Sequence, residues 1–251
     1  MKITVIGGTG LIGSKLVNKL RQLGHIVIAA SPDSGVNTIT GEGLGEAVKD
    51  SDVVVDVSNS PSFEDEAVMD FFQRSTKNLL EAAAYEKVKH YVALSIVGAD
   101  RLTASGYMRA KLEQEELIKL SGVPYSILRS TQFFEFAGRI AKDSTIGNEV
   151  RISTGAIQPI ASDETVAALA DVVINQPLNA TVEVGGPVRM PMSEFIRYYL
   201  TVMEDPRQLV PDEHTQYFGA DLNDSSLVTG ENARLGKVRY EDWLSTQLVK
   251  A

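Results

Sequence analysis

The 251-residue chain contains no cysteine and three histidines, His25, His90 and His214, which lie far apart in the sequence. The absence of cysteine excludes disulfide bonds, thiolate zinc sites and cysteine nucleophiles. The histidines do not follow any metal-ligand spacing, so each is expected to have a structural or surface role. We therefore predict a protein without a metal site.

The chain also lacks a surplus of basic residues and a long apolar run. Its 33 Asp and Glu against 24 Lys and Arg give a net charge of -9, and an acidic surface repels the phosphates of nucleic acids. No segment approaches the roughly 20 apolar residues that cross a membrane. The first six residues enter a strand directly, without a signal-peptide pattern. We expect a cytoplasmic protein that binds neither nucleic acid nor membrane.

The first half of the chain alternates short apolar segments with amphipathic ones, which predicts strands alternating with helices. The predicted strands are 2–6, 26–30, a short one at 36–40, 53–57, 90–94 and 124–128, and the predicted helices are 11–23, 63–85 and 107–120. This alternation predicts an α/β fold with a doubly wound parallel sheet and helices on both faces. Ligands of such sheets bind beyond the carboxyl ends of the strands.

A glycine-rich turn, Gly7-Gly8-Thr9-Gly10-Leu11-Ile12-Gly13, joins the first predicted strand to the first helix. The backbone N–H groups and helix dipole of such a turn bind a pyrophosphate, and glycine lets the backbone approach it closely. The spacing G-x-x-G-x-x-G differs from the commoner G-x-G-x-x-G, and a glycine triplet alone is a weak signal. Its place between a buried strand and an amphipathic helix favours NAD(P) binding over the alternative, a tight turn without a ligand.

The end of the second predicted strand, Ala30-Ser31-Pro32-Asp33, bears on the choice of dinucleotide. In an NAD site, an acid about 20 residues past the glycines binds the ribose 2'-hydroxyl and would repel a 2'-phosphate. No acid stands at this strand end, and no arginine stands there to bind a phosphate. Ser31 and Ser34 are candidate hydrogen-bond donors to a 2'-phosphate. The sequence favours NADP and leaves NAD open.

Tyr107 and Lys111 lie one helical turn apart on one face of a predicted helix, and Ser95 ends the preceding strand. A neighbouring ammonium lowers the pKa of a phenol from its usual value near about 10 towards the working pH. These residues predict carbonyl reduction, with Tyr107 as the acid, Lys111 as its electrostatic partner and Ser95 as a donor to the substrate carbonyl.

The same spacing occurs in Tyr85 and Lys89, so position rather than spacing carries this prediction. Tyr85 lies at a helix end just before a strand begins, on the wrong edge of the sheet for a ligand. Tyr107 follows a strand end by one loop, on the ligand side. The alternative is that Tyr107 and Lys111 are ordinary surface residues of a helix.

Together these motifs resemble the short-chain dehydrogenase/reductase superfamily, and more specifically its atypical, NmrA-like branch of NAD(P)-binding proteins. The glycine turn, residues 121–131 and Gln158-Pro159-Ile160 carry the resemblance. It implies a Rossmann-type fold with Ser58 and Asn59 beside the cofactor and Arg129 to Thr131 near the nicotinamide. Ser130 stands where many members have proline. The candidate cofactor-binding residues are Gly7, Thr9, Gly10, Leu11, Ile12, Gly13, Ser31, Ser58, Asn59, Ser130 and Thr131.

The second half of the chain is less regular. Helices are predicted over 163–173 and 193–203, a strand over 181–184 that rejoins the sheet, and loops over 206–240. We expect residues 1–150 to form the dinucleotide-binding core and residues 151–251 a smaller substrate-side lobe, within one compact domain. Phe133 and Phe134 are candidates to line an apolar substrate pocket, and a hydrophobic seam between the lobes is the alternative.

The leading hypothesis is an NADP-preferring oxidoreductase that transfers hydride to a small carbonyl or quinone-like substrate. The second is a non-catalytic NAD(P)-binding redox sensor, because the branch that the chain resembles contains members without catalytic activity. A weaker third is an isomerase or epimerase that uses bound NAD transiently. A homodimer formed through helix 63–85 is left open.

Overall fold

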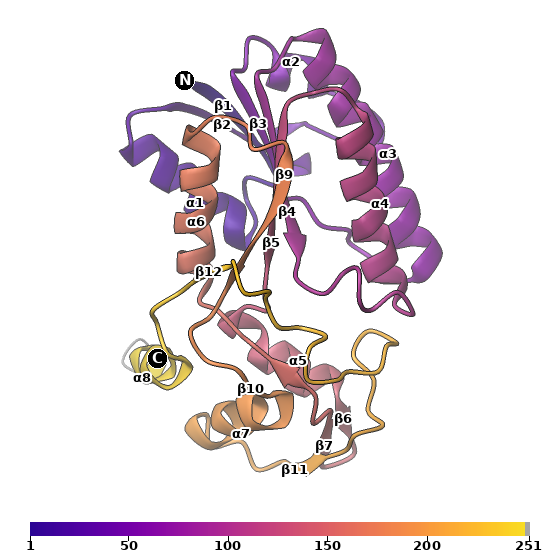
Figure 1. Ribbon diagram of the computed structural model, residues 1–251, viewed down its shortest axis with the longest axis vertical. Coiled ribbons are helices and arrows are strands. Elements are labelled where there is room, and N and C mark those ends of the chain that lie inside the picture. Colours follow the sequence, from indigo (N-terminus) through magenta and orange to yellow (C-terminus); the bar gives the residue numbers. More distant parts are fainter. Residues whose placement is uncertain (249–251) are drawn as a thin grey trace. The chain divides into compact units, whose positions relative to one another are not determined.

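The computed structural model describes residues 1–248 and contains a seven-stranded parallel sheet with the strand order β12-β9-β5-β4-β3-β1-β2 (Figure 1). Its strands are β1 (Lys2–Ile6), β2 (Ile26–Ala30), β3 (Val53–Asp56), β4 (His90–Ile96), β5 (Tyr125–Ser130), β9 (Ala180–Gly185) and β12 (Arg234–Leu235). Ile6 of β1 lies opposite Ala30 of β2 and opposite Asp56 of β3. The carboxyl ends of these three strands therefore meet at one edge. The predicted Rossmann-type α/β fold is confirmed.

Contacts divide the chain into two compact units. Unit 1 comprises residues 1–95, 106–129 and 166–182, and unit 2 comprises residues 96–105, 130–165 and the described residues from 183 on. Strands β4, β5 and β9 each pass from one unit into the other. Each of the two segments expected from the sequence, 1–150 and 151–251, contributes residues to both units.

The helices of unit 1 cover both faces of its strands. Figure 1 shows α1 and α6 on one face and α3 and α4 side by side on the other. These helices are α1 (Leu11–Gln22), α2 (Leu44–Val48), α3 (Asp65–Tyr85), α4 (Gly106–Leu120) and α6 (Ser162–Ile174), of which α6 belongs to unit 1 from residue 166 on. Leu79 of α3, Tyr91 of β4 and Ile118 of α4 are fully buried in one cluster. This apolar layer fixes α4, which carries the predicted catalytic pair, against the sheet.

The strand predicted over 36–40 is wrong. Val36 and Thr38 are buried at alternate positions, as in a strand, but this segment forms no ladder. The Asn37 side chain accepts hydrogen bonds from the amides of Ile39 and Thr40, and the Asn78 amide donates to the carbonyls of Thr38 and Ile39. Side chains thus replace the strand partner that the backbone would otherwise need. The short helix α2 that follows was not predicted.

Unit 2 is built from short elements. They are η2 (Phe134–Phe136), α5 (Ala137–Asp143), β6 (Thr145–Ile146), β7 (Glu149–Ile152), β8 (Ala156–Ile157), β10 (Met190–Pro191), α7 (Met192–Val202), β11 (Gln208–Pro211) and α8 (Tyr240–Leu248), together with the ends of the shared strands. The loop-rich segment before α8 is fastened by side chains: Arg101 donates to the carbonyls of Ser225 and Val228, and Glu164 accepts from the amides of Lys237 and Val238.

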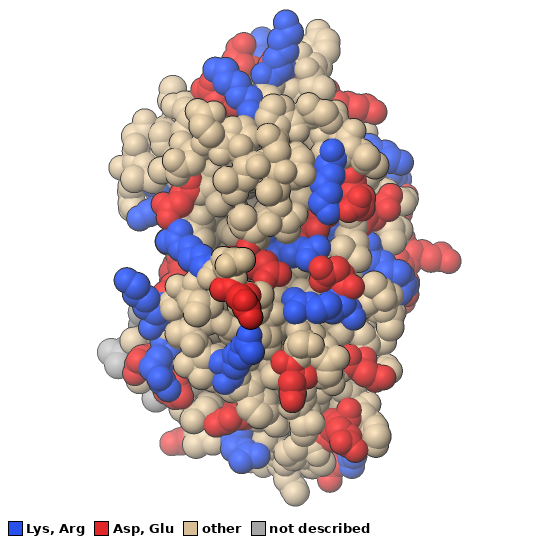
Figure 2. Space-filling view, viewed as in Figure 1, with Lys and Arg blue, Asp and Glu red and all other residues tan. Residues whose placement is uncertain are grey.

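Acidic and basic side chains are interspersed on the face drawn in Figure 2, rather than separated into large areas of one sign. Among residues 1–248, no helix combines the length and the apolar character that crossing a bilayer requires. The same residues contain no group of three or more His, Cys, Asp or Glu side chains arranged to hold a metal ion.

Candidate functional site

The glycine turn forms a tight backbone loop at the carboxyl end of β1. The amides of Gly7 and Gly8 donate to the carbonyl of Ala30 at the end of β2, at 2.9 and 3.1 Å, and Gly10 N donates to Gly7 O at 3.0 Å. Gly10 is the N-cap of α1, which begins at Leu11. The first amides of a helix have no intrahelical partner and carry partial positive charge. They are therefore presented at the edge of the sheet where an anion can bind.

Three of the glycines lie too close to neighbouring backbone for any other residue. A Cβ atom at Gly13 would come within 2.0 Å of Gly7 O, and one at Gly8 within 2.8 Å of Ala29 Cα. Gly7 has a φ of +77°, and a Cβ there would meet Ser58 Cα at 2.9 Å. The backbone at the start of α1 is thus in close contact with the glycine turn, and the turn is in close contact with the segment after β3. The predicted cofactor residues Gly7, Gly13 and Ser58 are brought together.

Ser31 is the residue that follows β2. Its side chain is buried, and its hydroxyl has no hydrogen-bond partner among the described residues. A buried hydroxyl without a partner is costly, and a ligand bound at this strand end would satisfy it. In this fold the segment after the second strand meets the adenosine ribose. The glycine turn and this hydroxyl both fit a dinucleotide, which the amides that begin α1 and Ser31 would hold.

Tyr107 lies in the first turn of α4, and its hydroxyl donates to Asn59 Oδ1 at 3.0 Å. Its ring packs beside Phe63, with ring centroids 5.3 Å apart, and near Phe72 of α3. Burial raises the pKa of Tyr107 to about 12, against the hydrogen bond to Asn59, which lowers it. The structure thus places a protonated phenol against the segment that follows β3.

Lys111 is 3% exposed and directs its ammonium towards the ends of the strands. Its Nζ donates to the carbonyl of Leu94 in β4 at 2.9 Å and to Gln114 Oε1. The Phe72 ring centroid lies 4.5 Å from Nζ, which adds a cation–π contact. Burial lowers the pKa of Lys111 to about 8, and the charges of Asp56 and Glu115 act in the opposite direction.

Ser95 is buried, and its hydroxyl donates to Glu115 Oε1 at 2.7 Å. Glu115 is fully buried and forms a two-point ion pair with Arg129, whose Nε and Nη2 each lie 2.8 Å from a carboxylate oxygen. Alternate residues of a strand share a face. Ser95 therefore lies under α4 on the same face of β4 as Tyr91 and Ala93, and its only hydroxyl hydrogen makes a hydrogen bond to a carboxylate.

Sequence reasoning missed Asp56, Gln114 and Glu115, all buried beside the predicted set. Lys111, Gln114 and Glu115 share one helical face with the buried Met108 and Ile118. Polar residues that recur at helical spacing within an apolar stripe are the signal that could have found two of the three. Asp56 ends β3 and becomes identifiable only when the sheet order places it beside α4.

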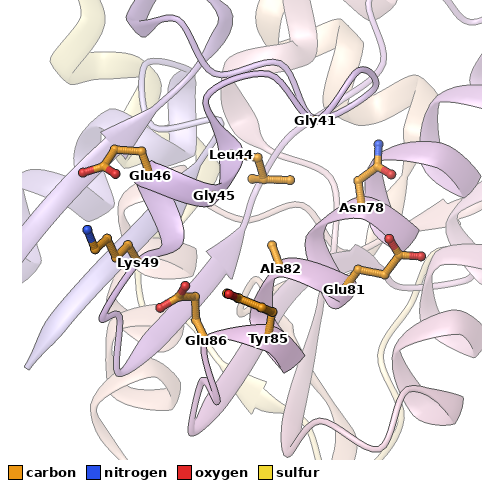
Figure 3. A pocket seen from close by; sticks show the side chains of 10 residues that line it. All are labelled: Gly41, Leu44, Gly45, Glu46, Lys49, Asn78, Glu81, Ala82, Tyr85 and Glu86. Carbon is orange, nitrogen blue, oxygen red and sulfur yellow. The ribbon is translucent and has the colours of Figure 1, made fainter.

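The second Tyr–Lys pair lies elsewhere in unit 1. Tyr85 ends α3 and is 84% exposed, and it lines a cavity of about 590 Å³ between α2 and α3 together with Leu44 and Ala82 (Figure 3). Lys89 pairs with Asp52 at 2.7 Å, and the Asp52 amide donates to the Lys2 carbonyl at the beginning of β1. Lys89 thus lies at the amino-terminal edge of the sheet, as its position in the sequence predicts.

The remaining candidates belong to unit 2. Ser130 Oγ lies 2.9 Å from Thr165 Oγ1, and the Thr131 amide donates to Val184 of β9 at 3.1 Å. Phe133 packs against Phe136. Phe134 is 1% exposed and packs against Tyr240 and Trp243, with ring centroids 4.9 and 5.6 Å away. Its apolar neighbours come from α8, and a contact with substrate stays a prediction.

The fold and the glycine turn define a dinucleotide-binding protein, and comparison with known families agrees. Residues 7–177 match the family described as NAD(P)H-binding. The chain belongs to this family. The match begins at the glycine turn and extends beyond α4, so it includes most of unit 1. It confirms the NAD(P) binding that the glycine turn predicts.

One curated relative is the photosystem II assembly factor Ycf39 of Cyanophora paradoxa, which is 29% identical over 149 residues. The match covers 54% of this chain and 46% of the relative, so it extends over about half of the relative's length. MoeE5, solved with UDP-glucuronic acid and NAD, is 18% identical with a TM-score of 0.78, covering 99% of this chain and 98% of MoeE5. The dTDP-4-dehydrorhamnose reductase of Bacillus anthracis, solved with NADP, is 14% identical with a TM-score of 0.76, covering 100% and 99%. These two structures share the fold.

Proposed function

We propose that the protein is an NADPH-preferring reductase of a small carbonyl or quinone-like substrate, with Tyr107 as proton donor and Lys111 as its electrostatic partner. The placement of these two side chains carries the proposal. The Tyr107 hydroxyl contacts Asn59 just beyond β3, and Lys111 Nζ contacts the Leu94 carbonyl near the end of β4. Both therefore lie at the carboxyl edge of the sheet, where this fold binds its ligands.

Each side chain has a separate task. NADPH supplies the hydride when it is bound. Tyr107 keeps its proton at neutral pH, because burial raises its pKa to about 12, and gives that proton to the substrate oxygen. The Lys111 ammonium, one turn further along α4, stabilises the phenolate that remains. The Ser95 hydroxyl donates a hydrogen bond to Glu115, so a donor role towards the substrate requires that hydrogen bond to break first.

Replacing Tyr107 with Phe tests the proton donor. Phe keeps the ring contacts with Phe63 and Phe72 but removes the hydroxyl. We expect NADPH-dependent reduction of a panel of quinones and aldehydes to fall by at least about 100-fold, while NADPH affinity, measured by fluorescence titration, is unchanged. Tyr85→Phe is the matched control and should have full activity. Undiminished turnover in Tyr107→Phe would remove the proton-transfer role.

Replacing Ser31 with Asp tests the dinucleotide preference. A carboxylate at the end of β2 repels a 2'-phosphate and accepts a hydrogen bond from a 2'-hydroxyl. Wild type should bind NADPH more tightly than NADH, and Ser31→Asp should reverse this order, with NADPH weakened by at least about 10-fold. Ser245→Asp, at an exposed position of α8, controls for the added charge. Equal NADPH and NADH affinities in wild type would refute the preference.

A second candidate is a non-catalytic NAD(P)H sensor. It is favoured because both predicted catalytic hydroxyls donate to acceptors of the protein rather than being available to a substrate: Tyr107 donates to Asn59, and Ser95 donates to Glu115. The curated relatives, named as assembly factors, also support a role through protein partners. This candidate predicts different affinities for NADPH and NADP⁺ by calorimetry, with no turnover across the same quinone and aldehyde panel. Turnover that depends on Tyr107 would exclude it.

A further inference from the structure

The ammonium of Lys111 is buried, and uncharged hydrogen-bond acceptors hold it in place. Within the described part of the chain, its hydrogen bonds go to a backbone carbonyl, that of Leu94, and to the side-chain amide of Gln114. The Phe72 ring covers a further side. A buried ammonium has a high desolvation cost, so the group that holds it determines both its direction and its charge.

Gln114 can present only its oxygen to Lys111. Its Nε2 donates to Asp56 Oδ2 at 2.8 Å, and an ionised carboxylate only accepts hydrogen bonds. Asp56 is 1% exposed, and its other oxygen accepts from the amide and hydroxyl of Ser58 at 3.0 and 2.6 Å. The Tyr91 hydroxyl lies 3.3 Å from Oδ2 and donates to it. Asp56 is thus held by the segment after β3 and by β4, and it fixes the orientation of the Gln114 amide.

We propose that Gln114 is a positioning residue whose amide, oriented by Asp56, holds the Lys111 ammonium at the carboxyl edge of the sheet. The proposal rests on the proposed function, in which Lys111 supplies positive charge beside Tyr107. Replacing the amide by a carboxylate or by an apolar side chain of similar length should therefore move the titration of Lys111 in opposite directions. If Gln114 only fills space, the apolar replacement should leave the titration of Lys111 unchanged.

The charges that act on Lys111 come from Asp56 on β3 and Glu115 on α4, while Phe72 from α3 contributes an uncharged ring. Tyr91 on β4 reaches this group through Asp56. Burial is the largest influence on Lys111 and lowers its pKa to about 8. A carboxylate at position 114 would raise the Lys111 pKa, against the effect of burial. Loss of the amide would remove an acceptor of the ammonium, and the Lys111 pKa would fall further.

The first test uses the full chain without cofactor or substrate. Lysine labelled with ¹³C at Cε is titrated by NMR, and the Lys111 signal is assigned by its loss in Lys111→Arg. We expect a midpoint near 8 in wild type, a rise of at least about 1 unit in Gln114→Glu, and a fall in Gln114→Met. Gln22→Glu, at an exposed position of α1, adds the same charge and should leave the midpoint unchanged.

A second variant keeps the test decisive if Gln114→Met does not fold. Asn in Asp56→Asn can donate as well as accept, so it no longer fixes the direction of the Gln114 amide. The variant also removes the Asp56 charge, which raises the Lys111 pKa, so both changes should lower the Lys111 midpoint. Midpoints that stay within about 0.3 units of wild type in both Gln114→Glu and Asp56→Asn would overturn the proposal. So would a shift of Gln114→Glu and Gln114→Met in the same direction.

The activity readout separates this proposal from the proposed function. Lys111 is charged below its midpoint, so kcat of NADPH-dependent quinone reduction should decline as the pH rises through about 8. In Gln114→Glu this decline should move to higher pH by the same amount as the NMR midpoint. If wild type shows no turnover, the reductase proposal fails while the NMR result still decides the role of Gln114. If turnover occurs and its decline stays fixed while the midpoint moves, the link to the reaction is overturned.

Discussion

Replacing Gly13 with alanine is expected to abolish dinucleotide binding. The added Cβ would lie 2.0 Å from the carbonyl oxygen of Gly7, so the start of α1 must move away from the turn. The amides that begin α1 would then no longer converge on one anion. Titration of the variant with NADPH and NADH by calorimetry should give no heat of binding at concentrations that saturate wild type.

The stability of this variant distinguishes packing from helix propensity. Gly13 lies within α1, where alanine is favoured over glycine by roughly 0.5–1 kcal/mol. The backbone clash opposes this, since overpacking costs about 1–3 kcal/mol or more, and we expect a net loss of stability by urea denaturation. Gly45→Ala in α2, where a Cβ meets nothing within 4 Å, should gain stability instead. A Gly13→Ala protein that binds NADPH normally would show that the turn does not hold the cofactor.

The strands could be predicted because their signals are local. Apolar and β-branched residues at 26–30, between a glycine and a serine–proline pair, match β2 without error. The failure at 36–40 has a tertiary cause. The alternating burial of Val36 and Thr38 is real, but the hydrogen bonds of this segment go to side chains, one of which, Asn78, lies on α3. No pattern within the segment records that partner.

The candidate site could be predicted only in part. The order of strands and helices predicts at which edge of a parallel sheet a residue lies. It therefore placed Tyr107 at the ligand-binding edge and Tyr85 at the opposite edge. The acceptor to which each hydroxyl donates its hydrogen bond could not be predicted. Ser95 was expected to donate to a substrate, yet it donates to Glu115, twenty residues further along the chain. Hydrogen-bond direction depends on which acceptors the packed helix brings near, and that is known only from the folded arrangement.

Replacing Glu115 with alanine is expected to destabilise the protein by about 3–5 kcal/mol, the cost of removing one partner of a buried ion pair. Glu115 is fully buried, and the Arg129 side chain is only 10% exposed. The variant would remove the carboxylate that the guanidinium contacts at two points and the acceptor of the Ser95 hydroxyl. Urea denaturation measures the loss. Glu116→Ala is the matched control, because Glu116 is 58% exposed and a surface pair with Lys119 contributes about 0–1 kcal/mol.

The double variant Glu115→Leu, Arg129→Leu separates the cost of an orphaned charge from the worth of the pair. Exchanging both partners of a buried pair for apolar residues is often neutral or stabilising, so the double variant should be more stable than Glu115→Ala. Glu115→Gln should fall between Glu115→Ala and wild type, because its amide oxygen still accepts from Ser95 while the charge opposite Arg129 is lost. If Glu115→Ala is no less stable than Glu116→Ala, the pair does not hold α4 against β5, and the apolar contacts of α4 with the sheet and with α3 position Tyr107.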